Sequence, residues 1–376
     1  MRPVPTTAAA AAATATKPQP DPWITSDRIF QILLAVSFPL AVASHFFFPG
    51  TATFILSCVA LIPLARLMGE ATEVISHRLG SGLGGLMNAS FGNAAELIIA
   101  IAALRSGQVA VVKASITGAV LGNVLLVLGA AVLAGGLRRE KQTFNATAAL
   151  SGSSMMYLAL TALIVPDILH LAQGDAALPL MRPLSIAISV ILLAIYALSL
   201  LFQLRTHAHI YAGEGQGTEE ELPPWSVRRA VVVLLGSTLG VVVVAEFLVH
   251  ALEAAIDSFG FTHTFVGVII IAIVGNAAEH STAVLMALKN KIDLAFNIAF
   301  ESSKQIALLV APVLVLLAIP FGQTLTLEFT HMEVVSIALS VGAATLVALD
   351  GHSNWLEGVM LVGVYAILAT AFYFVP

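Results

Sequence analysis

The sequence predicts an all-α polytopic membrane protein with about 11 transmembrane helices, arranged as two inverted five-helix repeats plus an extra N-terminal helix. Three observations support this fold class: an apolar composition, a series of long apolar segments and an internal repeat. Of the 376 residues, 58% are hydrophobic and only 10% are charged, whereas soluble domains contain about 25% charged residues. So little polar surface cannot cover so large an apolar core in water, so the chain requires lipid as its solvent.

A transmembrane helix needs about 20 predominantly apolar residues. Segments of this kind, with short loops between them, occur at residues 30–48, 51–69, 83–105, 109–136, 145–169, 183–204, 227–251, 263–288, 292–318, 331–349 and 354–375. The single cysteine, Cys58, lies inside an apolar segment, which excludes a disulfide and a cysteine metal site. No basic stripe indicates binding to nucleic acid.

The chain divides into five parts. Residues 1–28 are rich in Ala, Thr and Pro without periodicity, and this composition predicts a disordered tail. Residues 29–49 form the extra helix, and residues 50–204 form the first repeat. Residues 205–226 form an acidic cytoplasmic linker, because they combine glutamates with glycines and two prolines. Residues 227–376 form the second repeat.

The distribution of Lys and Arg predicts the orientation. With the N-terminus in the cytoplasm, alternate loops place 13 of the 17 basic residues inside: Arg2, Lys17, Arg28, Arg66, Arg78, Arg138, Arg139, Lys141, Arg205, Arg228, Arg229, Lys289 and Lys291. Only Arg105, Lys113, Arg182 and Lys304 remain. This bias supports an odd number of spans, with the C-terminus outside.

The internal repeat is carried by one motif. Gly92-Asn93-Ala94-Ala95-Glu96 recurs as Gly275-Asn276-Ala277-Ala278-Glu279, 183 residues later. Each half then contains five spans, and an odd number inverts the second half in the membrane. Inverted repeats are typical of secondary transporters, which bind their substrate near the midplane between the repeats.

Glu96 and Glu279 are the candidate ion ligands. Both lie more than a dozen residues inside a predicted span, too deep for their carboxylates to reach either surface. Asn93 and Asn276 precede them by three residues and therefore share a helix face with them. Each repeat thus offers one carboxylate and one amide oxygen, which suit Ca2+, Mg2+, Mn2+ or Na+ rather than soft metals.

Paired carboxylates in a low-dielectric site cannot both remain ionised without a cation. One divalent cation or protons can neutralise Glu96 and Glu279, and the two states exclude each other. This competition is the minimum mechanism of cation/proton antiport. The alternative, that each glutamate only forms a buried hydrogen bond between helices, is weaker for two glutamates in identical repeated motifs.

Further polar residues lie in the spans that follow the two motifs. At the same offset, Gly118 aligns with Glu301 and Gly122 with Gln305, so the segment Gly118 to Asn123 lies opposite Glu301-Ser302-Ser303-Lys304-Gln305. Small and amide side chains suit close helix packing, so each of four side chains either contributes to the site or holds helices together: Asn123, Ser302, Ser303 and Gln305. Glu73 and Glu246 lie near helix ends, where they either face water or serve as a gate or a point of ion access.

The two motifs resemble the paired signatures of the calcium/proton exchanger family of the Ca2+/cation antiporter superfamily. The resemblance extends to Leu104-Arg105-Ser106-Gly107-Gln108 after the first motif and to Ala287-Leu288-Lys289-Asn290-Lys291 after the second, and it covers residues 50–375. It implies that Glu96 and Glu279 bind the cation and protons alternately. It also implies helper roles for Asn93, Asn276, Ser302 and Gln305.

Four residues depart from the family pattern: Ala119 and Gly122, which stand where the family commonly has Ser, and two charged residues. Glu301 stands where the family usually has Gly, and Lys304 stands where an uncharged residue is usual. An unpaired charge at this depth would be very costly, so we expect Glu301 and Lys304 to pair and cancel. In the competing hypothesis, Lys304 occupies part of the ion site and alters its affinity or substrate.

The sequence therefore predicts a transporter rather than an enzyme: a Ca2+/H+ antiporter that exports Ca2+ by alternating access and needs no cofactor beyond its two substrates. The alternative is an antiporter for another cation, Na+/Ca2+, Mn2+/H+ or K+/H+. No catalytic motif or nucleotide domain accompanies the carboxylates. Short loops favour a bacterial inner membrane over a eukaryotic organelle.

Overall fold

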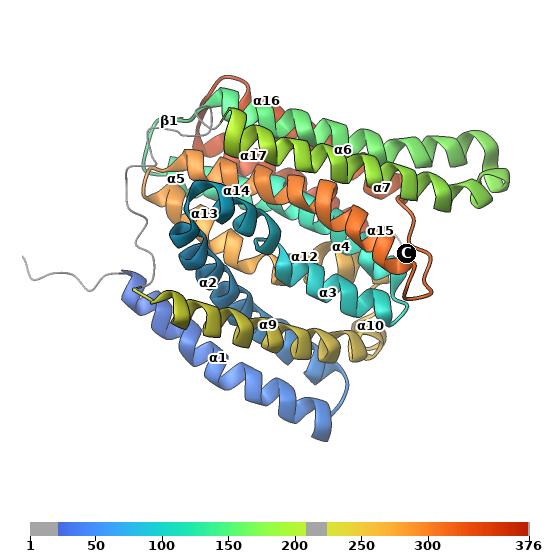
Figure 1. The fold of residues 1–376 in the computed structure, drawn as a ribbon, viewed down its shortest axis with the longest axis horizontal. Coiled ribbons are helices and arrows are strands. Elements are labelled where there is room, and N and C mark those ends of the chain that lie inside the picture. Colours follow the sequence, from blue (N-terminus) through green and yellow to red (C-terminus); the bar gives the residue numbers. More distant parts are fainter. Residues whose placement is uncertain (1–21, 208–223, 375–376) are drawn as a thin grey trace, which may run out of the picture.

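The computed structural model describes residues 22–207 and 224–374. It is a bundle of helices with one pair of two-residue antiparallel strands, β1 (Gln142–Thr143) and β2 (His352–Ser353) (Figure 1). The prediction of an all-α fold is correct except for this short pair, which joins two loops at one end of the bundle. Most of the predicted tail and most of the predicted linker lie outside the described residues.

The helices of the first part of the chain follow the predicted apolar segments. They are α1 (Pro22–Phe47), α2 (Thr51–Phe91), α3 (Ala94–Arg105), α4 (Val109–Leu121), the π-helical η1 (Gly122–Val127), α5 (Leu128–Gly136), α6 (Ala146–Gln173), the 3-10 turn η2 (Gly174–Ala177), α7 (Leu178–Leu201) and the π-helical η3 (Phe202–Thr206). The segments α4, η1 and α5 form one continuous rod.

The second part begins after the linker. It contains α9 (Val227–His250), α10 (Leu252–Phe259), α11 (His263–Phe265), η4 (Val266–Ile271), α12 (Ala272–Gly275), α13 (Ala277–Leu288), α14 (Ile292–Gln305), η5 (Ile306–Val310), α15 (Ala311–Ala318), α16 (His331–Ala348) and α17 (Trp355–Phe374). Here η4 and η5 are π-helical, and η5 joins α14 and α15 into a second continuous rod.

The length and polarity of these helices are those of a polytopic membrane protein. Among the described residues, eight helical stretches are long and apolar enough to cross a membrane. The number rises to nine if the pair formed by α10 and residues 263–275, bent by 115°, counts as one span. One of the eight stretches, residues 146–206, contains both α6 and α7, which lie side by side as two helices in Figure 1.

Two observed boundaries differ from the predicted ones. The first helix begins at Pro22, before the predicted start at residue 29, and proline is favoured at the first position of a helix. The second helix continues beyond residue 69 to a break at Gly80, where φ is 78°. Apolar windows detect the part of a helix that lipid covers, and they miss a charged end that continues into water.

The helices form three groups in Figure 1. The helices α1, α2 and α9 lie together at the bottom, α6 and α7 lie at the top with α16 and α17, and the two rods lie between them with α3, α12 and α13. Burial agrees with this arrangement. In the most apolar part of α1, at the bottom, 17% of residues are buried, whereas in the most apolar part of the rod from Val109 to Gly136 the share is 83%. The rods therefore form the core.

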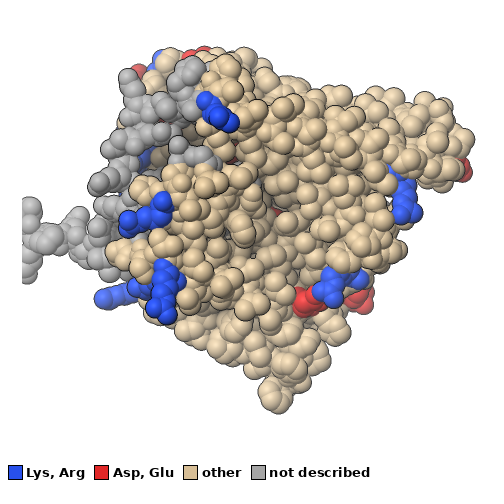
Figure 2. Space-filling model, in the orientation of Figure 1, with Lys and Arg blue, Asp and Glu red and all other residues tan. Residues whose placement is uncertain are grey.

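Charge is distributed as a membrane requires. Figure 2 shows Lys and Arg side chains at the left and right edges of the molecule and a broad uncharged surface between them. Exposed Leu, Ile, Val and Phe side chains are numerous along α1, α6, α7 and α17. An exposed apolar surface of this extent is expected where lipid contacts the protein.

Candidate ion-binding site

Both repeated motifs lie at breaks between two helices. The helix α2 ends at Phe91, and Asn93 adopts a non-helical conformation (φ −104°, ψ 29°) before α3 begins. In the second motif, α12 ends at Gly275, and Asn276 adopts nearly the same conformation (φ −93°, ψ 9°) before α13 begins. The identical sequences thus produce the same local structure twice.

The two glutamates occupy the first turn of the helix that follows each break. Glu96 lies in the first turn of α3, and Glu279 lies in the first turn of α13. The amide groups of a first turn carry a partial positive charge, which favours an ionised carboxylate there. The broken helices therefore place each carboxylate where its negative charge can be tolerated within the membrane.

The carboxylates of the two repeats approach each other. Their charges are close enough to interact, and a methyl group placed on Gly275 would lie 3.4 Å from the Cγ atom of Glu96. One oxygen of each carboxylate, Oε2, is buried and accepts no hydrogen bond among the described residues. Buried acceptors without donors are costly, so these two oxygens are suited to a cation or a proton.

A chain of hydrogen bonds connects five amide and hydroxyl side chains beside the carboxylates. Asn93 donates to Gln305 (2.7 Å), Ser302 donates to Asn93 (2.9 Å), and Asn123 donates to Ser302 (2.8 Å). The Nδ2 atom of Asn123 also lies 3.4 Å from the Oδ1 atom of Asn276. The chain joins side chains of both halves, and Ser302 also contacts Glu279.

Asn123 is a member of this cluster, although the sequence left open whether it contributes to the site or only holds helices together. Its side chain is fully buried in η1, and its Oδ1 atom accepts no hydrogen bond among the described residues. Asn123 therefore supplies a third buried oxygen without a donor. Its position 30 residues after Asn93 was visible in the sequence, but it has no counterpart in the second half, where Ile306 stands at the same offset.

A narrow cavity reaches Glu96. Its polar wall contains Glu96, Asn276 and Ser115, and the rest is apolar: Ile99, Ala100, Ile116, Ala119, Ile271, Ala272, Ile306 and Val310, with Gly275. From Glu96 the lining follows α3 and α4 toward the loop that joins them. Glu279 is not part of this lining, so the two carboxylates differ in their access to the cavity.

Glu301 and Lys304 form an ion pair one turn apart on α14. The side chain of Lys304 is almost completely buried, whereas that of Glu301 is 33% exposed. Gln203 of η3 donates a hydrogen bond to Glu301 at 3.1 Å. Glu301 is thus directed toward η3, while its neighbour Ser302 is directed toward the amide cluster.

Glu73 and Glu246 lie apart from this cluster, and neither lines the cavity at Glu96. Thr51 in the first turn of α2 contacts Ser258, beyond the end of α9, and Leu64 packs against Gly240. The helices α2 and α9 are therefore antiparallel, and the two glutamates lie at opposite ends of the pair. Glu246 is 44% exposed and lies 3.4 Å from Arg105.

Glu246 lines a second, wider cavity together with Gln108, Glu253 and His250. Glu253 accepts hydrogen bonds from His263 (3.1 Å) and Gln108 (2.8 Å). These bonds, that from His263 first, hold the pKa of Glu253 below its usual value, because they stabilise its ionised form. The surface of this cavity is therefore acidic at neutral pH.

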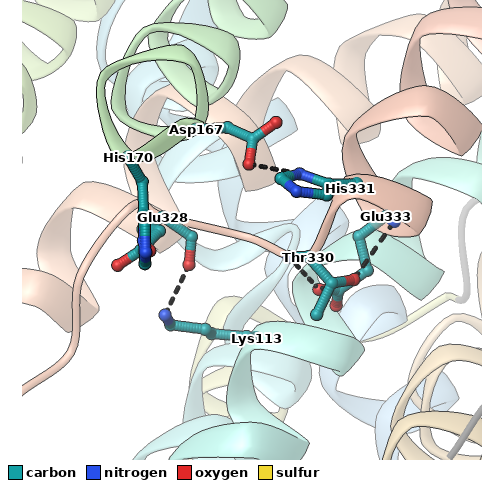
Figure 3. A network of polar contacts seen from close by, with 7 residues as sticks. All are labelled: Lys113, Asp167, His170, Glu328, Thr330, His331 and Glu333. Carbon is teal, nitrogen blue, oxygen red and sulfur yellow. Dashed lines mark hydrogen bonds and ion pairs between the residues drawn. The ribbon is translucent and has the colours of Figure 1, made fainter. Parts of the chain in front are cut away.

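A polar network that sequence reasoning did not predict fixes the N-terminal part of α4 (Figure 3). Lys113 donates to the carbonyl oxygen of Glu328 and to the hydroxyl of Thr326. Two turns before the amide cluster, Thr117 donates to Glu333 at 3.2 Å, and Glu333 caps the start of α16. Because α4 also forms a wall of the cavity at Glu96, this network holds that wall in place.

Two histidines extend the network to α6. His331 lies 2.7 Å from Asp167, and His170 contacts Glu328 (Figure 3). These partners are far apart in the sequence: Asp167 and His170 lie on α6, His331 begins α16, and Glu328 lies in the loop before α16. No local pattern could have indicated that they meet.

Comparisons with known proteins place this site in a family. Residues 49–205 and 229–374 match the family described as sodium/calcium exchanger protein. The "Ca(2+)/H(+) antiporter" of Synechocystis sp. is 44% identical over 368 residues, which cover 94% of this chain and 99% of the relative. The "Ca(2+)/H(+) antiporter ChaA" of Bacillus subtilis is 43% identical, over 92% of this chain and 99% of its own.

Solved structures agree with this result. The Ca2+/H+ antiporter protein YfkE is 40% identical and superposes with a TM-score of 0.80, covering 93% of this chain and 100% of its own. The H+/Ca2+ exchanger CAX, at 15% identity, shows the same fold with a TM-score of 0.68 over 93% of this chain and 92% of its own. The resemblance predicted from the two repeated motifs is confirmed, and the chain belongs to the sodium/calcium exchanger protein family.

Proposed function

We propose that this protein is a Ca2+/H+ antiporter that exports Ca2+ from the cytoplasm in exchange for protons. The observation that carries the proposal is the approach of Glu96 and Glu279, each with a buried oxygen that has no hydrogen-bond donor. The names of the most similar relatives support the same activity. The proposal describes a transporter with Ca2+ and H+ as substrates, without a resident cofactor and without an enzymatic step.

The oxygens in and around the broken helices form the proposed ligand set. Ca2+ binds six to eight oxygens in flexible arrangements. Glu96 and Glu279 would supply carboxylate oxygens, and Asn123 would supply its unpartnered amide oxygen. Asn93, Asn276, Ser302 and Gln305 would complete or position this set through their hydrogen bonds, and water in the cavity could fill remaining positions.

Proton coupling follows from the same two carboxylates. When Ca2+ leaves, two ionised carboxylates would face each other in a poorly solvated site, which is unfavourable unless protons neutralise them. When Ca2+ binds, these protons must leave. The site therefore holds either Ca2+ or protons. A change of access with neither bound would leave both carboxylates ionised and would be unfavourable.

Alternating access would use eleven spans in two inverted repeats. The helices α1, α4 to α5, α6, α7, α9, α14 to α15, α16 and α17 give eight spans, residues 51–80 give one, and the two broken segments 81–105 and 263–288 give two. The equivalent breaks at Asn93 and Asn276 support this count, as do the two matched family ranges. The repeats are 50–204 and 227–376, joined by the linker 205–226.

The proposed orientation follows the basic residues. We place the N-terminus and the linker in the cytoplasm, because 13 of the 17 Lys and Arg residues then lie on that side. The bacterial relative supports the inner membrane of a bacterial cell as the location. In this orientation, the cavity at Glu96 extends toward the outer surface.

The other predicted residues receive secondary roles. Glu246, which is exposed beside the second cavity, would attract cations at the outer surface. Glu73 would act as a gate or a point of ion access at the cytoplasmic end of its helix. Glu301 and Lys304 would cancel each other beside the site and leave its charge to Glu96 and Glu279.

Transport into vesicles tests the proposal. We expect vesicles with an acidic interior to take up Ca2+ when they contain the wild-type protein, and to lose this uptake with Glu96→Gln or Glu279→Gln. Glu140→Gln, which changes an exposed carboxylate in a loop, should leave it unchanged. Uptake of Mn2+, Na+ or K+ in place of Ca2+ by folded wild-type protein would support the alternative substrate instead.

A further inference from the structure

A groove between α1, α2 and α9 combines apolar walls with two arginines. Its apolar surface is formed by Phe30, Leu34, Pro63, Leu67, Pro224 and Trp225. Arg66 and Arg229 face this surface from two different helices, α2 and α9. The groove lies far from the broken helices and shares no residue with the cavity at Glu96.

The two guanidinium groups are held over aromatic rings. The Cζ atom of Arg66 lies 4.2 Å from the centre of the Phe30 ring, and that of Arg229 lies 5.2 Å from the centre of the Trp225 ring. Stacking of this kind orients the flat face of a guanidinium. Both arginines are therefore presented to the groove in defined orientations.

The groove has a net positive charge. Its one carboxylate, Glu70, accepts a hydrogen bond from the Nε atom of Arg66 at 2.6 Å. Among the described residues, the guanidinium of Arg229 forms no ion pair with a carboxylate. Two guanidinium groups and one carboxylate leave one positive charge, and this favours an anion.

The position of the groove indicates the kind of anion. Arg228 and Arg229 lie in the first turn of α9, at the end of this helix that we place in the cytoplasm. Trp225 precedes them, and tryptophan is enriched at the boundary between lipid tails and headgroups. A basic pocket between transmembrane helices at this level is typical of sites for anionic lipid headgroups.

We propose that this groove binds one anionic phospholipid of the cytoplasmic leaflet, with its phosphate between Arg66 and Arg229 and an acyl chain along the apolar wall. Guanidinium groups recognise phosphate through paired, charge-assisted hydrogen bonds. A soluble anion would use the arginines but would leave the apolar wall uncovered. A lipid satisfies both surfaces at once.

The bound lipid would add contacts to a group of helices in which α2 packs against both α1 and α9, whereas α1 and α9 contact each other only slightly. The helix α1 is the most exposed of the apolar spans, and α2 and α9 belong to different proposed repeats. A lipid whose phosphate contacts Arg66 of α2 and Arg229 of α9, and whose tail contacts α1, adds interactions among all of them. Its binding should therefore stabilise the folded protein.

Thermal unfolding of the full-length protein in neutral detergent tests the site. We expect phosphatidylglycerol to raise the unfolding temperature, and phosphatidylcholine of the same acyl chains or inorganic phosphate to have much smaller effects. In Arg229→Gln the phosphatidylglycerol concentration needed for half the effect should rise about tenfold, as the loss of a charge-assisted hydrogen bond predicts. Arg228→Gln is the matched control, because Arg228 is adjacent but does not line the groove.

A second variant makes the test independent of any damage by Arg229→Gln. Glu70→Gln removes the carboxylate that engages Arg66 and raises the positive charge of the groove, so phosphatidylglycerol should bind more tightly than to wild type. Equal loss in Arg228→Gln and Arg229→Gln would overturn the proposal in favour of unspecific surface charge. An effect of inorganic phosphate equal to that of phosphatidylglycerol would also overturn it, in favour of a site for a free anion.

Discussion

Lys304, almost completely buried in α14, forms an ion pair with Glu301 one turn earlier, and the two side chains differ in exposure. Removing one partner of a buried ion pair leaves the other charge without compensation, which costs about 3–5 kcal/mol of stability. Glu301→Gln should cause the full loss of stability, because it leaves the buried Lys304 charge unpaired. Lys304→Met should cause a smaller loss, because Glu301 is 33% exposed and keeps its hydrogen bond from Gln203.

We therefore expect Glu301→Gln to lower the thermal stability more than Lys304→Met, and the double variant to recover most of the loss. The double variant should also retain transport, since the pair contributes no net charge to the site. The measurements are thermal unfolding in detergent and the Ca2+ concentration for half-maximal uptake. A folded double variant whose Ca2+ affinity changes by tenfold or more would place Lys304 in the ion site itself.

Ser302 and Ser303 form a second matched pair. Ser302 donates to Asn93 and accepts from Asn123, whereas Ser303 donates to the carbonyl oxygen of Ala299 within its own helix. Ser302→Ala would leave polar atoms of the amide cluster without a partner, at a cost of about 1–3 kcal/mol. We expect about a tenfold loss of Ca2+ affinity in this variant, measured by Ca2+ binding or by uptake. Ser303→Ala should have little effect, and equal effects of the two changes would contradict the proposed cluster.

Gly118 and Gly122 lie one turn apart on the rod that begins with α4, and their surroundings differ. A Cβ atom on Gly118 would lie 2.1 Å from the carbonyl oxygen of Val268, whereas one on Gly122 would meet no atom within 4 Å. Gly118→Ala must therefore separate α4 from η4, with an expected loss of about 1–3 kcal/mol or more. Gly122→Ala should be tolerated. The thermal unfolding temperatures of the two variants decide the matter, and a stable Gly118→Ala protein would show that the two helices are less tightly packed.

The sequence was sufficient to predict the candidate carboxylates and the polytopic fold. Charged residues are so costly within a membrane that Glu96 and Glu279 were conspicuous against their apolar surroundings, and their identical motifs indicated related positions. Long apolar segments are equally distinctive, so most helices lie where they were expected. Both signals are local, and local patterns can be read directly from a chain.

Contacts between distant segments could not be predicted in this way. Asn123 joins the amide cluster only because η1 packs against α14, and Lys113 meets Glu328 only because α4 lies beside the loop before α16. The helical continuation from residue 70 to Gly80 was also missed, because apolar windows do not detect a charged end of a helix. The two contacts depend on how helices pack, and a single sequence carries no direct record of packing.

The pH dependence of Ca2+ binding tests whether both carboxylates exchange protons for the cation. If Glu96 and Glu279 are both protonated in the free protein, one Ca2+ ion must displace two protons, so affinity rises with pH. The apparent dissociation constant should then fall by about a hundredfold per pH unit on the acidic side, and the slope should decrease toward zero once both groups are ionised. In Glu96→Gln or Glu279→Gln only one proton remains to be displaced, and the fall should be about tenfold per unit. Glu140→Gln should behave as wild type.

Calorimetric titration with Ca2+ in buffers of different ionisation enthalpy counts the released protons directly. A wild-type protein that releases only one proton would show that one of the two glutamates stays ionised throughout the cycle, and the variant that abolishes this release would identify the single proton carrier.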